Sequence, residues 1–310
     1  MKIGLQIYQF NWLGTPENTA SRLSEMASYA EQGGFSSLWV MDHLWQVSQG
    51  FGPPEDPMLE GYSTISYLAA ETKKVKLGLM VTATPYRHPG LLVKAVTTLD
   101  VLSGGRAILG IGAGWNKEEA EGFGIPFPKS KAELFGRLEE TVRIARHIWS
   151  SEGEPFEGKY YRLLKPVNHP QPISKPHPPI LIGGEGEKRT LRLVAKHGDA
   201  CNLQLGSAVE GYAPWLRELY KNRRSNLTRK LGILKEHCKN VGRDYDEIEI
   251  TVLGTVRISP DPSNIPEIVN LCRELNDLGV DQVIFNMPNV YDLWPIERIG
   301  AEVIPAVADL

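Results

Sequence analysis

The sequence predicts an α/β protein with a (β/α)8 barrel, and three observations carry this prediction. Eight short apolar segments rich in β-forming residues alternate with helical patterns along the 310 residues. Leu77–Ala83 and Ala107–Ile111 are two of these segments, and a single helix pattern joins them, which indicates a right-handed parallel βαβ unit. No G-x-G-x-x-G follows the first strand, so the usual dinucleotide-binding fingerprint of an open sheet is missing. An open doubly wound sheet is the alternative.

The individual elements follow from periodicity and from helix end signals. Ser130 and Glu133 form a capping box that begins a helix, and Gly104-Gly105 ends an earlier one. That earlier helix is expected to bury a stripe made of Leu91, Leu92, Ala95, Leu99 and Leu102. The expected strands are Ile3–Gln9, Ser37–Met41, Leu77–Ala83, Ala107–Ile111, Ile180–Ile182, Asp199–Leu203, Ile248–Leu253 and Gln282–Asn286.

One segment does not fit the alternation. Gly153–Pro179 is rich in proline, follows the fourth helix of the pattern, and carries a strand-like Tyr160-Tyr161 pair. We interpret it as an inserted excursion with a short hairpin. The prediction is therefore a single domain over residues 1–310 with an insertion at about residues 153–179.

Composition excludes several classes of protein. The chain has 34 basic and 37 acidic residues, a net charge of −3, and no basic face of the kind that nucleic-acid binding requires. No apolar run approaches the length of about 20 residues that spans a membrane. Cys201, Cys238 and Cys272 form no C-x-x-C, which gives zinc sites no support and favours buried free thiols. Met1 leads straight into a strand, so we expect a cytoplasmic protein without a signal peptide.

Polar or glycine-rich residues follow several of the expected strands. Asp42-His43 follows the second strand, Gly112, Ala113 and Gly114 follow the fourth, and Gly183-Gly184-Glu185-Gly186 follows the fifth. Ligands bind at the carboxyl ends of the strands in α/β folds. Glycines there let backbone N–H groups approach a phosphate, and the next helix offers its positive end. Thr190 adds a hydroxyl at that point; a plain strand-to-helix turn is the alternative reading.

Four stretches carry a resemblance to a known family. They are Asp42-His43, the Tyr86–Pro89 loop, Leu99–Trp115 and Pro178–Asn202. With these stretches the chain resembles the bacterial-luciferase-like superfamily and, within it, the oxidoreductases that use the deazaflavin coenzyme F420. The resemblance extends over nearly the whole chain to about residue 202 and holds only at the level of the fold beyond it.

The resemblance implies roles for the residues after the second strand. The histidine that matches His43 is the acid/base beside the deazaflavin in the similar sugar-phosphate dehydrogenases, and histidine titrates near neutral pH. Asp42 is expected to orient His43 or to contact the ring system. The sugar-phosphate enzymes use a glutamate near the exit of the fourth strand as proton donor. The matching residue here is Ala113, a departure that argues against the sugar-phosphate reaction.

The resemblance also implies a cofactor site. The family has a bulge with a non-prolyl cis peptide in the third strand, and the matching pair is Leu79-Met80. Lys188 and Arg189 either meet an acidic tail of the coenzyme or lie in solvent. The full expected cofactor site is Leu79, Met80, Gly112, Ala113, Gly114, Gly183, Gly184, Glu185, Gly186 and Thr190. Aromatic residues at strand exits are expected to wall the substrate pocket, or else to belong to the core: Tyr8, Trp12, Trp45 and Trp115.

The leading functional hypothesis is an F420-dependent oxidoreductase that transfers a hydride between the deazaflavin C5 and a small organic substrate. An FMN-dependent monooxygenase, supplied with reduced flavin by a separate reductase, is the alternative within the same superfamily. A catalytically silent flavin or deazaflavin carrier is a third reading. Family members commonly pair through their second and third helices, so a homodimer is also expected.

Overall fold

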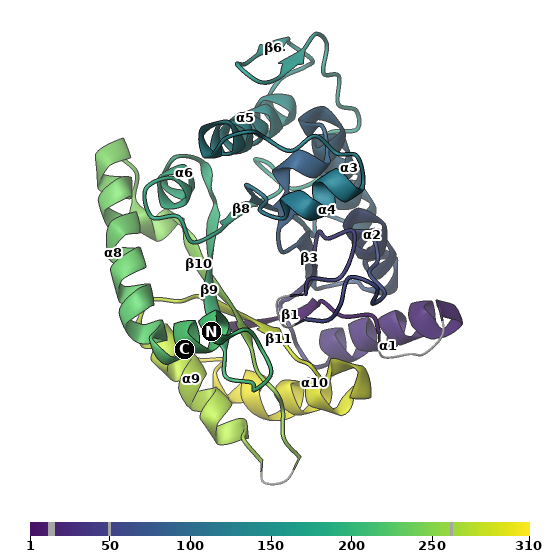
Figure 1. Ribbon diagram of the computed structural model, residues 1–310, viewed down its shortest axis with the longest axis vertical. Coiled ribbons are helices and arrows are strands. Elements are labelled where there is room, and N and C mark those ends of the chain that lie inside the picture. Colours follow the sequence, from purple (N-terminus) through teal and green to yellow (C-terminus); the bar gives the residue numbers. More distant parts are fainter. Residues whose placement is uncertain (12–15, 49–50, 261–262) are drawn as a thin grey trace.

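The computed structural model describes residues 1–11, 16–48, 51–260 and 263–310 and forms a closed parallel barrel surrounded by helices (Figure 1). Each strand pairs in parallel with the next, and the last pairs with the first through Lys2↔Gln282, which closes the barrel. The predicted (β/α)8 barrel is therefore confirmed. Its strands are β1 (Lys2–Ile7), β2 (Ser37–Val40), β3 (Lys76–Leu79), β5 (Ala107–Gly112), β8 (Ile180–Gly183), β9 (Ala200–Ser207), β10 (Glu249–Thr255) and β11 (Gln282–Asn286).

The third barrel strand is interrupted by a bulge. β3 continues as the short strand β4 (Thr82–Ala83), and both pair with β5. Leu77 pairs with Ala107 and Thr82 with Ile111, so one extra residue is inserted between the two pairings. The cis peptide bond lies between Met80 and Val81. The predicted pair, Leu79-Met80, is wrong by one position, because an apolar strand pattern does not reveal where a bulge inserts its residue.

Helices surround the barrel. They are α1 (Thr19–Gln32), α2 (Gly61–Glu71), α3 (Pro89–Ser103), α4 (Lys117–Gly122), α5 (Lys131–Ser150), α6 (Thr190–His197), α7 (Pro214–Lys221), α8 (Arg223–Val241), α9 (Ile265–Asp277), α10 (Trp294–Arg298) and α11 (Ile304–Ala306). The predicted stripe of α3 is only partly right: Leu92 and Leu99 are buried, whereas Leu91 and Leu102 are 65% and 77% exposed. Each residue turns the helix by about 100°, which carries these two leucines away from the buried face.

The proline-rich segment contains a two-stranded antiparallel hairpin, β6 (Phe156–Glu157) with β7 (Arg162–Leu163), near α5 (Figure 1). Tyr160 and Tyr161 lie in its turn rather than in a strand, which corrects the expected strand position. The reason is a carboxylate of α5: Glu140 Oε2 accepts the two tyrosine N–H groups at 2.8 and 3.1 Å.

Trp39 fills the interior of the barrel. Its ring occupies space that side chains at Gly78 and Gly110 would need, and a Cβ at Gly110 would lie 2.0 Å from the carbonyl oxygen of Leu79. The three cysteines are buried and free, as expected. Within the described ranges, no helix combines the length and apolar character that crossing a bilayer requires. The barrel is thus filled at its centre, and open space lies at the carboxyl ends of its strands.

Candidate active site

A cavity of about 390 Å³ lies at the carboxyl ends of β2, β4, β5, β8, β9 and β10. Small-molecule sites typically enclose roughly 300–1,000 Å³. The cavity brings together most of the predicted site residues; Leu79, Tyr8 and Trp45 do not line it. Its lining comprises Asp42, His43, Met80, Val81, Ala83, Tyr86, Gly112, Ala113, Gly114, Trp115, Asn116, Phe135, Gly183, Gly184, Glu185, Gly186, Thr190, Asn202, Gln204, Trp215 and Leu253.

His43 follows β2 and is held by a buried carboxylate. Its Nδ1 lies 2.7 Å from Oε2 of Glu119, a residue with no exposed surface. A carboxylate only accepts hydrogen bonds, so Nδ1 carries the proton. In neutral His43 the lone pair is then on Nε2, for which no hydrogen-bond partner occurs among the described residues. The imidazole therefore presents a free nitrogen while its orientation is fixed.

Glu119 is held in place by α4, which begins at Lys117, three residues after Gly114 at the β5 exit. Asn116 caps this helix by accepting the Glu119 N–H at 3.2 Å. The carboxylate also accepts the Tyr86 hydroxyl at 2.6 Å and the N–H groups of Leu44 and Trp45. Burial alone would raise the pKa of Glu119, but the hydrogen bond from His43, with the Tyr86 and Leu44 donors, holds it below its ordinary value.

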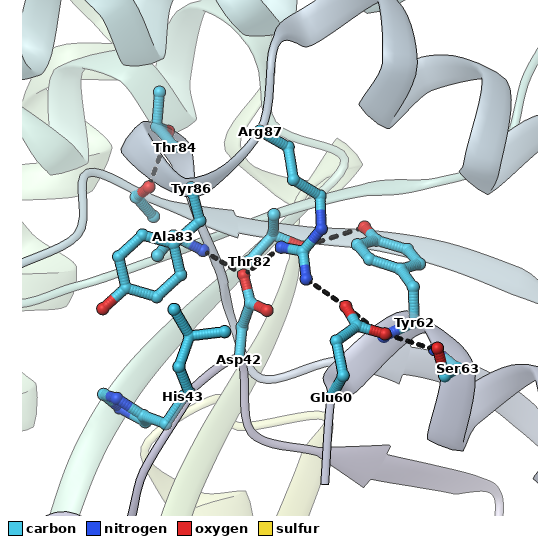
Figure 2. Close-up of polar contacts among 12 residues, drawn as sticks. Asp42, His43, Glu60, Tyr62, Ser63, Thr82, Ala83, Thr84, Tyr86 and Arg87 are labelled. Atoms are coloured by element: carbon cyan, nitrogen blue, oxygen red, sulfur yellow. Dashed lines mark hydrogen bonds and ion pairs between the residues drawn. The ribbon is translucent and has the colours of Figure 1, made fainter. Parts of the chain in front are cut away.

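Asp42 belongs to a second network, in which it contacts Ala83 and Arg87 (Figure 2). Its Oδ2 accepts Ala83 N–H at 2.8 Å and Arg87 Nη1 at 2.7 Å. Arg87 also pairs with Glu60, which caps α2, and lies over the Tyr62 ring. Asp42 therefore does not orient His43, which corrects one of its two expected roles. Its Oδ1 is buried without a partner in the described part of the chain.

Burial and charge set the protonation of the aromatic and cationic members of both networks. Burial and the Glu119 carboxylate raise the pKa of Tyr86, so its hydroxyl stays a donor. Burial opposes the charge of Arg87, but Asp42 and Glu60 outweigh it and raise the pKa of the guanidinium. Tyr86 is therefore a hydrogen-bond donor to Glu119, and Arg87 is a cation beside Asp42 and Glu60.

Glycines, which have no side chain, form part of one wall of the cavity. Val81, next to the cis bond, occupies the space that side chains at Gly112 and Gly183 would need, since a Cβ there would lie 2.8 and 2.9 Å from its methyl groups. The glycines therefore allow the β3–β4 bulge to pack against β5 and β8. Val81, Gly112 and Gly183 therefore line the cavity side by side.

The backbone N–H groups of the glycine segment at the end of β8 are used in two different ways. The Gly184 N–H is used by the sheet, because it donates to the Asn202 carbonyl at 3.2 Å. The N–H groups of Glu185 and Gly186 have no partner among the described residues, and both residues line the cavity. The Glu185 side chain accepts the Gln204 N–H and pairs with Lys230. Two of the expected backbone donors are therefore free.

The expected aromatic wall is assembled only in part. Trp115 lines the cavity and meets the His43 ring edge-on, with centroids 5.7 Å apart. Trp45 instead packs on α4, where its ring fills the space beside Gly122. Tyr8 is fully buried and pairs with Tyr212 at 2.5 Å between hydroxyl oxygens. Trp12 lies outside the described residues.

A second, larger cavity of about 1,070 Å³ adjoins the first and shares Ala113, Gly114, Trp115, Phe135, Glu185 and Gly186 with it. Lys188 and Arg189 line this larger space. It contains neither His43 nor Asp42, so the smaller cavity is the candidate reaction site and the larger one its extension.

Sequence reasoning missed several residues of the site. Glu119 is the most important, because α4 was not expected and an acidic residue in E-E-A-E has no distinguishing pattern. The available signal was its position, four residues after Trp115 and three after Asn116, a residue type that often caps helices. Tyr86 and Arg87 lay in a quoted loop without an assigned role, and Trp215 is contributed by α7 from a distant part of the chain.

Known proteins share this architecture. The model of the luciferase-like monooxygenase family matches residues 1–278. An F420-dependent glucose-6-phosphate dehydrogenase of Nakamurella multipartita is 32% identical over 91% of this chain and 78% of its own length. An FMNH2-dependent dimethylsulfone monooxygenase of Pseudomonas putida is 27% identical over 78% of this chain and 63% of its own.

The fold comparison agrees with the sequence comparisons. The coenzyme F420-dependent tetrahydromethanopterin reductase of Methanopyrus kandleri superposes with a TM-score of 0.74 at 19% identity, covering 98% of both chains. The family model covers most of the chain, and the dehydrogenase is similar over nearly all of it. The chain therefore belongs to the luciferase-like monooxygenase family.

Proposed function

We propose that this enzyme is an F420-dependent oxidoreductase that transfers a hydride between the deazaflavin C5 and a small organic substrate. One observation carries the proposal: His43, oriented by Glu119, lines the same cavity as the glycines at the ends of β5 and β8. The F420-dependent names of similar proteins in both comparisons support the choice of cofactor.

The residues of the cavity fit a phosphate-bearing ring cofactor. The wall of Val81, Gly112 and Gly183 suits a flat ring, and the buried Asp42 Oδ1 is free to accept a hydrogen bond from it. The free N–H groups of Glu185 and Gly186 and the beginning of α6 suit a phosphate. Lys188 and Arg189 in the adjoining cavity suit an acidic tail.

Coenzyme F420, when bound, supplies hydride chemistry at its C5. The chain's own contribution is to move the accompanying proton. His43 takes or gives this proton at Nε2 while Glu119 accepts its Nδ1–H and holds the ring in one orientation. Tyr86 and the Leu44 and Trp45 amides keep the carboxylate ionised and fixed. In this proposal His43 is the catalytic residue and Glu119 a positioning residue.

Binding measurements test the proposal and its alternative. Fluorescence quenching gives separate dissociation constants for F420 and FMN, and we expect F420 to bind more tightly. Tighter binding of FMN would favour the monooxygenase alternative. Gly184→Asp should abolish F420 binding, because it places a side chain and a negative charge beside the free N–H groups. Gly242→Asp is the matched control, since its surroundings are open and it ends α8.

We also propose that residues 1–310 form one domain and that the chain forms a homodimer. The exposed Leu91 and Leu102 on α3 support an apolar contact surface there. Sedimentation should give a dimer at micromolar concentration, and Leu102→Lys should shift it toward the monomer. A monomeric wild-type protein would contradict the dimer.

A further inference from the structure

Helix α8 contacts the loop that joins β8 to α6, and α8 packs beside α6 (Figure 1). Lys230 of α8 forms an ion pair with Glu185 of this loop, and Arg229 forms one with Glu187. His237 Nε2 donates to the Glu187 carbonyl at 2.8 Å, since a carbonyl oxygen only accepts. Three side chains of one helix therefore hold the loop that lines the active-site cavity.

Lys230 differs from its neighbour Arg229 because it is buried. The side chain of Lys230 is 7% exposed, whereas that of Arg229 is 51% exposed. A lysine is almost never fully buried unless it is paired. Burial lowers the pKa of Lys230, and the carboxylate of Glu185 that it contacts favours the charged form. The described residues supply no other carboxylate to Lys230, so this ion pair depends on Glu185 alone.

Glu185 brings a negative charge to the loop that is suited to a phosphate. Its own N–H and that of Gly186 have no partner among the described residues. Its carboxylate accepts the Gln204 N–H at 2.6 Å and pairs with Lys230. Because the carboxylate and a free N–H belong to the same residue, a phosphate bound there lies close to a like charge and is repelled by it. Lys230 supplies the compensating positive charge.

A buried hydroxyl group lies beside the same backbone. Thr190, the first residue of α6, is 3% exposed and lines the cavity. A Cβ at Gly186 would lie 2.8 Å from its Oγ1, and one at Gly184 would lie 3.6 Å from it. In the part of the chain that the structure describes, this hydroxyl has no hydrogen-bond partner. It can therefore act as a third donor beside the two free N–H groups.

We propose that Lys230 is a positioning residue for the cofactor phosphate, because it neutralises Glu185 and so allows the free N–H groups and the Thr190 hydroxyl to bind an anion. Lys230 lines neither of the two adjoining cavities, so it acts through Glu185 rather than by contact with the ligand. The identity of the cofactor rests on the proposed oxidoreductase function, whereas the dependence of phosphate binding on Lys230 does not.

Fluorescence titration with two pairs of ligands isolates the phosphate. F420 is compared with its deazariboflavin fragment, which lacks the phosphate and the acidic tail, and FMN with riboflavin, which lacks only the phosphate. Lys230→Met should weaken F420 and FMN by roughly 5–50-fold, because it leaves the Glu185 charge uncompensated. The affinities for the fragment and for riboflavin should stay within about twofold of wild type, which also shows that the variant is folded. Equal losses for ligands with and without phosphate would overturn the proposal.

A second substitution separates charge from structural support. Adding Glu185→Gln to Lys230→Met should restore the F420 and FMN affinities to within about threefold of wild type, because no carboxylate then opposes the phosphate. Glu185→Gln alone should tighten both ligands by about two- to fivefold, because the Lys230 charge remains. If Lys230 only braced the loop, or bound the phosphate itself, the double variant would bind as weakly as Lys230→Met. That result would overturn the proposal.

Arg229→Met is the matched control. It removes one positive charge from the adjacent position of α8, but from an ion pair whose arginine is exposed. Solvent and salt screen such a pair, so the F420 and FMN affinities should change by less than about twofold. Equal losses in Arg229→Met and Lys230→Met would indicate a general effect of net charge and would contradict a specific role of Lys230.

Calorimetric titration with inorganic phosphate distinguishes this proposal from the cofactor assignment. Wild type should bind inorganic phosphate more tightly than Lys230→Met does. If F420 and FMN fail to bind while inorganic phosphate binding depends on Lys230, the oxidoreductase proposal fails and the role of Lys230 stands. If F420 or FMN binds equally to wild type and Lys230→Met, the role of Lys230 fails and the cofactor assignment stands. If no phosphate-bearing ligand binds to wild type, both proposals fail.

Discussion

The two halves of the barrel mouth are built in different ways. In the His43 half, at the exits of β2, β4, β5 and β8, two buried carboxylates are each held by several donors. In the Arg257 half, at the exits of β1, β9, β10 and β11, the buried polar contacts are neutral, among them the Tyr8–Tyr212 hydroxyl pair, and Arg257 and Glu210 are exposed. Buried ions need partners in fixed geometry, whereas exposed ones do not. The first half thus holds buried charges in fixed positions, whereas the second presents its charges to solvent.

The largest effect should come from His43→Ala in the first half. Loss of a general acid/base lowers turnover by roughly 10²–10⁴-fold. F420 affinity should stay within about tenfold of wild type, because most of the proposed cofactor contacts lie at the ends of β5 and β8. Stopped-flow turnover and fluorescence titration measure the two quantities. Turnover equal to wild type would assign the proton to another group, and no turnover in either protein would favour a silent carrier.

Arg87→Met should destabilise the fold by about 3–5 kcal/mol, because it leaves the buried Asp42 carboxylate without its cation. Urea unfolding measures the change. Arg22→Met is the matched control: it removes an exposed pair with Glu25 and should cost less than about 1 kcal/mol. Equal losses in the two variants would show that the buried Asp42–Arg87 pair contributes no more to the free energy of unfolding than the exposed Arg22–Glu25 pair.

Glu119→Gln should cost about 1.5–3 kcal/mol, because a charged acceptor is replaced by an amide. The cost should depend on pH. The folded-state pKa of Glu119 lies below its ordinary value near 4.5, so its stabilisation is present above that value and is lost as pH falls through the folded pKa. Unfolding free energies of wild type and variant should therefore converge in acid. A constant difference would contradict an ionised Glu119.

Tyr212→Phe in the second half should have the smallest effect, about 1 kcal/mol, since it leaves the Tyr8 hydroxyl buried without its partner. Adding Tyr8→Phe removes that unpaired hydroxyl, so the double variant should cost less than the sum of the singles. Urea unfolding of the three variants completes the cycle. Additive losses would mean that the two hydroxyls do not interact.

The alternation of strands and helices was predictable from the sequence, because apolar periodicity reports directly on which residues a barrel must bury. His43, Asp42 and the glycines after β5 and β8 were predictable for a related reason: they follow strands, and strand ends meet at one face of a barrel. Their placement around one cavity agrees with this expectation.

Only the tertiary structure decided the contacts between residues that are distant in the chain. Glu119 binds His43 across 76 positions, and Tyr8 binds Tyr212 across 204. The register of the bulge at Met80–Val81 likewise depends on β5, which must place glycines beside the bulge. Local periodicity carries no information on such pairs. The sequence therefore determined the fold and the face that carries the site, and the packing of helices and loops on the barrel selected the partner of each side chain.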